Sequence, residues 1–258
     1  MNAPANRSSA GKVLAIATPI AILATLAFNT LSNIAPPNGI NIGQLSNTLL
    51  RGVLITPANY AFAIWGLIYV GLIAYGIYQF RPAQQGDATI QQVDGWLIVA
   101  CIAQIAWVHL FTVQQFWPSV IAMLVILGSL VQAYLQLGIG KERVGRDRRW
   151  MAHIPFSVYL GWISVATVVN VASALYISQW DGWGLSADSW TVVMIVVATA
   201  IALTVVMQRA DVAFTLVFIW AYVAIAIRQA QVPSIWMTAV GGIIVLAIAL
   251  IARRLKRN

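Results

Sequence analysis

Ring-bearing and amide side chains recur at helical spacing in the most apolar stretches of this chain. They form three groups, which are Phe62, Trp65 and Tyr69; Gln104, Trp107 and Phe111; and Tyr159, Trp162, Ala166 and Asn170. Steps of three and four residues place the members of each group on one face of an α-helix. Indole and phenol rings stack on flat partners, and neutral amides donate and accept hydrogen bonds. The chemistry that this set favours is noncovalent binding of a flat hydrophobic ligand.

General acid–base catalysis is poorly supported by the same stretches. Apart from Arg209 and Asp211, which we expect to cap a tight turn, the charged residues lie in loops or near helix ends. His109 and His153 fall toward opposite ends of their spans, so they do not form a ligand pair. We therefore expect no catalytic residues, no metal site and no required cofactor, and an enzyme is not the class that the sequence favours.

The composition indicates a membrane protein. Of the 258 residues, 60% are hydrophobic and only 9% are charged, whereas a soluble domain carries roughly a quarter charged residues. The single cysteine, Cys101, excludes an internal disulfide and a cysteine-built metal cluster. It lies in an apolar run, where we expect it to be a small core residue.

Eight apolar runs are long enough to cross a bilayer, because a spanning helix needs about 17–25 residues, and three of these runs carry the three groups. They are Val13–Leu31, Ala58–Phe80, Gly95–Gln115, Pro118–Leu137, Ile154–Ile177, Trp190–Gln208, Val212–Ile227 and Ile235–Ala252, the seventh being the shortest. The first run is long for the apolar core of a signal peptide, so we expect an uncleaved span. The expected fold is an all-α, polytopic bundle of about eight transmembrane helices.

The basic residues fall on one side of this bundle. With the N-terminus in the cytoplasm, thirteen of them are cytoplasmic, whereas only Arg51 and Arg228 lie outside. The cytoplasmic set is Arg7, Lys12, Arg81, Lys141, Arg143, Arg146, Arg148, Arg149, Arg209, Arg253, Arg254, Lys256 and Arg257. This bias follows the positive-inside rule and accounts for the net charge of +8 without a nucleic-acid partner. We expect a multi-pass protein of a bacterial inner membrane with both termini in the cytoplasm.

Two interpretations of the aromatic faces stay open from the spacing. Trp65, Trp107 and Trp162 lie at comparable depth on three helices, with Gln104 and Asn170 as nearby amides. A cleft with apolar walls and a few fixed polar groups is the usual make-up of a small-molecule site. The alternative is a dry core in which the amides bond to neighbouring helices. In both cases, the outer loop Ser32–Thr56 is long enough to cover this end of the helices as a lid.

The motifs resemble those of the TspO family, the tryptophan-rich sensory or translocator proteins. Ala61–Tyr69 (AFAIWGLIY) resembles the second-helix signature of that family, and Gln104–Phe111 (QIAWVHLF) resembles its third-helix stretch. Tyr159–Trp162, followed eight residues after the tryptophan by Asn170, resembles its fifth-helix signature. The resemblance covers about residues 12–180, which is five helices and the first loop.

Departures from the family pattern are also present. The loop Ser32–Thr56 has no tryptophan, Gln104 stands where an asparagine is common, and His109 replaces a small residue or proline. The last three helices have no counterpart in the five-helix unit. We therefore expect a TspO-like bundle over residues 1–180 and an additional three-helix extension over 181–258.

The resemblance implies binding of a tetrapyrrole, such as protoporphyrin IX or haem, or of another hydrophobic small molecule, within the five-helix bundle. Carried over by position, the pocket residues are Trp65, Tyr69, Trp107, Trp162 and Asn170. The full expected ligand-binding set is the three groups given at the outset. The resemblance also implies a homodimer surrounded by membrane lipid, and a role as sensor or carrier. A transporter of hydrophobic molecules and an assembly subunit of a membrane complex are the alternatives.

Overall fold

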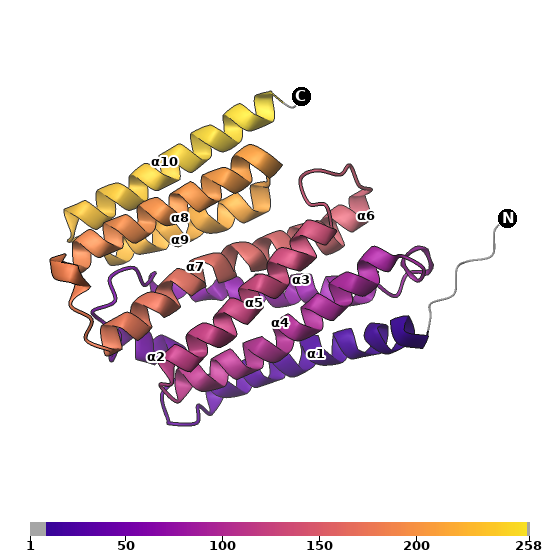
Figure 1. Cartoon of the computed structure of the whole chain (residues 1–258), viewed down its shortest axis with the longest axis horizontal. Helices are drawn as coiled ribbons and strands as arrows, with labels where there is room; N and C mark the ends of the chain where they lie inside the picture. Colours follow the sequence, from indigo (N-terminus) through magenta and orange to yellow (C-terminus); the bar gives the residue numbers. More distant parts are fainter. Residues whose placement is uncertain (1–8, 257–258) are drawn as a thin grey trace.

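The computed structural model describes residues 9–256 as a set of long helices lying roughly along one direction (Figure 1). No β-strand occurs within that range. The elements are α1 (Ser9–Ile34), α2 (Ile42–Asn47), the 3-10 turn η1 (Asn59–Ala63), α3 (Ile64–Tyr78), η2 (Pro82–Gln84), α4 (Ala88–Thr112), α5 (Phe116–Gln136), α6 (Arg146–Arg148), the π-helical turn η3 (Arg149–His153), α7 (Ile154–Ile177), η4 (Gly182–Gly184), α8 (Ala187–Arg209), α9 (Val212–Arg228) and α10 (Pro233–Leu255).

All eight predicted spans are helical. Within residues 9–256, seven helical segments are long and apolar enough to cross a membrane, and α9 is a shorter apolar helix of 17 residues. At 1.5 Å per residue α9 is about 25 Å long, near the lower limit for a span. The prediction of an all-α polytopic bundle is confirmed. Arg7 and Arg257, two of the basic residues expected on the cytoplasmic side, lie outside the described residues.

Local chemistry explains where the turn between α8 and α9 falls. Ala210 takes a left-handed backbone conformation (φ 51°), which ends α8. The carboxylate of Asp211 then accepts a hydrogen bond from the backbone N–H of Phe214, 3.2 Å away, and caps α9. The predicted cap by Asp211 is confirmed, whereas the Arg209 guanidinium instead donates to the carbonyl of Ile139 in the α5–α6 connection.

Helix α7 is the centre of the arrangement. It packs against α3 and α5 of the first part of the chain and against α9 of the last part. Figure 1 shows α8, α9 and α10 together on one side of α7, with α4 and α1 on the other. Gly161 allows the close approach of α9, because a Cβ atom there would lie 3.1 Å from Cβ of Val217.

Hydrogen bonds also join α9 to the segment before α3. The indole of Trp220 donates to the carbonyl of Ala61 at 3.2 Å, and the backbone N–H of Ala58 donates to the carbonyl of Ala224 at 3.1 Å. The side-chain amide of Gln229 donates to the carbonyl of Leu54 at 2.7 Å. The last helices are thus bonded to the first part of the chain, while the division at residue 180 stays a prediction.

The loop Ser32–Thr56 is folded and held in place. Its short helix α2 begins with a capping box between Asn41 and Gln44. At the end of α9, the guanidinium of Arg228 donates to the carbonyl of Ser46 at 2.8 Å and to the side chain of Asn47 at 3.2 Å. This loop is therefore attached to the bundle through the C-terminal part of the chain.

Candidate functional site

The first part of the predicted site is a ring cluster between α3 and α7. Trp65 stacks on Tyr69 with ring centroids 5.8 Å apart, and its edge meets Tyr159 at 6.1 Å. Phe62, which lies in η1 just before α3, meets Trp162 edge-on at 5.9 Å. Geometries of this kind are the favoured contacts of aromatic pairs. The structure therefore brings together five of the predicted residues here.

The second part lies between α4, α5 and α7. The indole N–H of Trp107 donates to Oδ1 of Asn170 at 2.6 Å, and the amide of Asn170 donates to Oγ of Ser119 at 2.9 Å. Phe111 packs on Trp107 at 5.4 Å and against Phe116 at 5.2 Å. Ser119 and Phe116 were not recognised from the sequence, although Ser119 follows Pro118 inside an apolar helix, where a hydroxyl needs a partner.

The three indoles lie inside the bundle and not on its lipid-facing surface. Trp107 and Trp162 expose 6% and 2% of their surface, and Trp65 is half-buried against the core. They nevertheless belong to two separate contact groups. Trp107 is committed to Asn170, so this part matches the dry-core interpretation. Ala166, partly buried, lies on α7 one turn from both Trp162 and Asn170.

Three buried polar groups around the first cluster make no hydrogen bond to any residue from 9 to 256. They are the hydroxyl of Tyr69, the amide nitrogen of Gln104 and the indole nitrogen of Trp162. The oxygen of Gln104, in contrast, lies 3.5 Å from the hydroxyl of Tyr159. An unpaired polar group in an apolar interior costs about 1–3 kcal/mol. All three groups are hydrogen-bond donors, so each can still donate a hydrogen bond.

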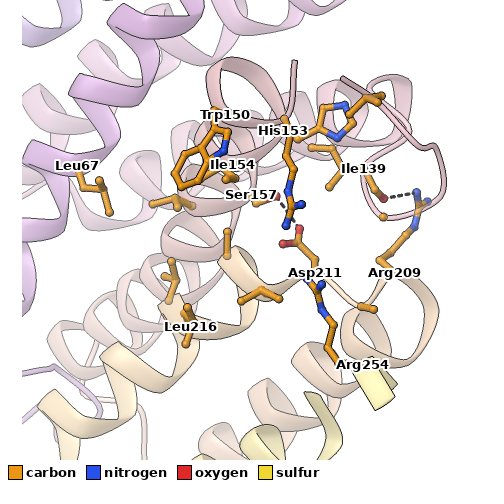
Figure 2. Close-up of a pocket in the computed structure, with 18 of the residues that line it drawn as sticks. Leu67, Ile139, Trp150, His153, Ile154, Ser157, Arg209, Asp211, Leu216 and Arg254 are labelled. Atoms are coloured by element: carbon orange, nitrogen blue, oxygen red, sulfur yellow. Dashed lines mark hydrogen bonds between the residues drawn. The ribbon is translucent and has the colours of Figure 1, made fainter. Parts of the chain in front are cut away.

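An open pocket of about 1100 Å³ lies elsewhere, and none of the ten predicted residues lines it. It is bounded by α3, the η3–α7 segment, α9 and the end of α10. Figure 2 shows the apolar side chains of Leu67, Ile154 and Leu216 on one side of it and the charged side chains of Arg209, Asp211 and Arg254 on the other. The pocket was not predicted, because its lining comes from segments far apart in the sequence.

Asp211 is the buried acid of this pocket and is 7% exposed. Its Oδ2 atom accepts hydrogen bonds from the hydroxyls of Ser157 at 2.6 Å and Tyr134 at 2.9 Å. One carboxylate thus joins α5, α7 and the start of α9. The signal in the sequence is an acid placed directly between two apolar spans, and that position by itself predicts only a helix cap.

Apolar helices of spanning length around an aromatic interior define a polytopic integral membrane protein. A family model described as TSPO-like protein matches residues 15–252, so the chain belongs to the TSPO-like family. The resemblance predicted from three motifs is confirmed, and the match runs on through α8, α9 and α10. No curated protein and no solved structure matches the chain.

Proposed function

We propose that this TspO-like protein binds a flat hydrophobic ligand, a tetrapyrrole such as a porphyrin or haem, and serves as a sensor or carrier. The observation that supports this most is the trio of unpaired groups beside the ring cluster: Tyr69, Gln104 and Trp162. A phenol, a primary amide and an indole all donate hydrogen bonds. The ligand must therefore bring acceptors, and a tetrapyrrole offers ring nitrogens and carboxylates on an otherwise apolar disc.

In this proposal the ligand enters the ring cluster from the side on which Phe62 and Trp65 lie. Both are half-buried, whereas Tyr69, Tyr159 and Trp162 are buried. The stacking of Trp65 on Tyr69 closes the cluster. The ligand therefore displaces one of these two rings and stacks on the other. The Trp107–Asn170 pair keeps a structural role in this proposal, because both partners already satisfy each other.

Orientation and assembly belong to the same proposal. The basic end of the bundle faces the cytoplasm of a bacterial inner membrane, since cytoplasmic loops carry the excess of Lys and Arg. The site then opens toward the outer side, next to the loop held by Arg228. The homodimer that the family resemblance implies is retained as a prediction.

The test is a titration of the detergent-solubilised protein with protoporphyrin IX, followed by the shift of its absorption band. Tyr69→Phe removes an unpaired hydroxyl, so the variant should unfold at a higher temperature while binding porphyrin several-fold more weakly. Tyr222→Phe is the matched control. Its hydroxyl is bonded to Ile195 at 3.1 Å, so the variant should lose stability and keep its affinity. Unsaturable binding, or equal affinity loss in both variants, would refute the proposal.

A further inference from the structure

A groove runs along α7 between α3 and α9. Its floor includes Ile154 and Val158 of α7, and its walls include Leu67 of α3 and Leu216 of α9. It reaches from the start of α9 to Trp220, a rise of about 12 Å at 1.5 Å per residue. Leu67 and Leu216 are exposed, so the groove opens on the lipid-facing side of the bundle. Its shape and lining fit an extended apolar chain.

One end of the groove is strongly basic. Four arginines line the pocket there, against two acids, Glu142 and Asp211, which leaves a formal excess of two positive charges. The arginines are Arg143, Arg149, Arg209 and Arg254. They come from the α5–α6 connection, η3, α8 and α10, so four separate segments converge on this end.

Three of these guanidinium groups have no side-chain partner within the part of the chain that the structure describes. Arg143, Arg149 and Arg254 are exposed and make no hydrogen bond or ion pair to any residue between 9 and 256. Asp211 forms no ion pair with them among the described residues, and its carboxylate accepts hydrogen bonds from the hydroxyls of Ser157 and Tyr134 and from the backbone N–H of Phe214. Unpaired guanidinium groups next to an apolar groove match a ligand with a phosphate head, which arginine binds through paired hydrogen bonds.

A buried histidine adds an independent observation. His153 lines the same pocket and is 6% exposed, and its Nε2 atom makes no hydrogen bond to the described residues. It lies in the π-helical turn η3 with Arg149 and Trp150, which also line the pocket. Such turns insert an extra residue into a helix and occur frequently at functional sites. The head of the ligand would therefore meet both cations and an unpaired ring nitrogen.

We propose that this groove binds one anionic phospholipid of the surrounding membrane. The phosphate lies among Arg143, Arg149 and Arg254, and an acyl chain lies along Leu67, Ile154 and Leu216. The lipid site goes beyond the proposed tetrapyrrole function, since none of the ring-cluster residues lines it. The acyl chain of a lipid suits the apolar end of the groove, and an anionic head suits the basic end. A zwitterionic head would instead bring a cation next to the arginines.

The experiment measures lipid retention by native mass spectrometry after the full-length protein is equilibrated with equal amounts of phosphatidylglycerol and phosphatidylcholine. The native protein should retain one phosphatidylglycerol preferentially. The double variant Arg149→Gln/Arg254→Gln should reduce that preference roughly tenfold or more. Its control, Arg146→Gln/Lys256→Gln, removes two exposed charges that do not line the pocket and should keep the preference.

A second pair of variants tests the apolar part. Leu216→Trp fills the groove and should lower phosphatidylglycerol retention, whereas Leu124→Trp adds the same bulk at an equally exposed position of α5 and should not. Tyr69→Phe, which probes the tetrapyrrole site, should leave lipid retention unchanged. Equal retention of the two lipids by the native protein, equal loss in the two charge variants, or no effect of Leu216→Trp would overturn the lipid site.

Discussion

The indole N–H of Trp107 donates to the side-chain oxygen of Asn170 at 2.6 Å, and this bond joins α4 to α7 inside the bundle. Both residues come from motifs that resemble ligand-binding positions of the family. In this chain they bind each other, and the amide of Asn170 extends the contact to Ser119 of α5. The pair therefore stabilises the packing of three helices.

Replacement of Trp107 should expose the structural role of this pair. Trp107→Phe leaves the Asn170 oxygen unpaired in an apolar interior, which should lower the free energy of unfolding by about 1–2 kcal/mol. Thermal or detergent-induced unfolding measures the loss. Trp117→Phe is the control, because Trp117 is 49% exposed and bonds Ser178 at the end of α7. An equal loss in both variants would contradict the assigned role.

Asp211 should be the acid on which the bundle depends most. Asp211→Ala removes the acceptor of Ser157, Tyr134 and the first turn of α9, so we expect a loss of about 2–4 kcal/mol in unfolding free energy. Asp211→Asn keeps the cap oxygen and offers an amide to the two hydroxyls, so its loss should be smaller. Chemical unfolding in detergent compares the two. A variant pair with identical losses would show that the hydrogen bonds do not account for the effect.

The loop over the bundle should loosen when its contact with α9 is removed. Arg228→Gln breaks the bonds to Ser46 and Asn47, so amide hydrogen exchange in α2 should accelerate roughly tenfold while α4 and α7 keep their protection. Arg51→Gln removes an exposed basic residue of the same loop and should leave exchange unchanged. If exchange in α2 is the same in both variants, Arg228 does not hold the loop.

Gly140 should be intolerant of any side chain. Its backbone has φ +78°, and a Cβ atom there would collide with the backbone of Arg209 at the end of α8. Gly140→Ala should therefore lower the unfolding free energy by about 1–3 kcal/mol and disturb the basic end of the pocket. Gly145→Ala is the control, since Gly145 has φ −59° and open space around it. Its stability should be unchanged or slightly raised.

The ring cluster shows how far spacing alone can go. The steps of three and four placed Trp65 and Tyr69 on one helix face, and they do stack on each other. Spacing also predicted that Trp107 and Trp162 point into the bundle. It did not indicate that Trp107 would take Asn170 as its partner, because hydrogen-bond pairing between helices depends on their rotation and height, which the pattern of one helix leaves open.

The sequence by itself determined the all-α class, the eight long apolar helices and the cap at Asp211. These features are local, since length, apolar content and capping groups act within a few turns of one helix. Only the tertiary structure decided the groove on α7. Leu67, Arg149, Leu216 and Arg254 are far apart along the chain and meet only after α3, α9 and α10 have packed. A site whose parts come from separate helices has no local pattern, so its chemistry emerges only from the packing.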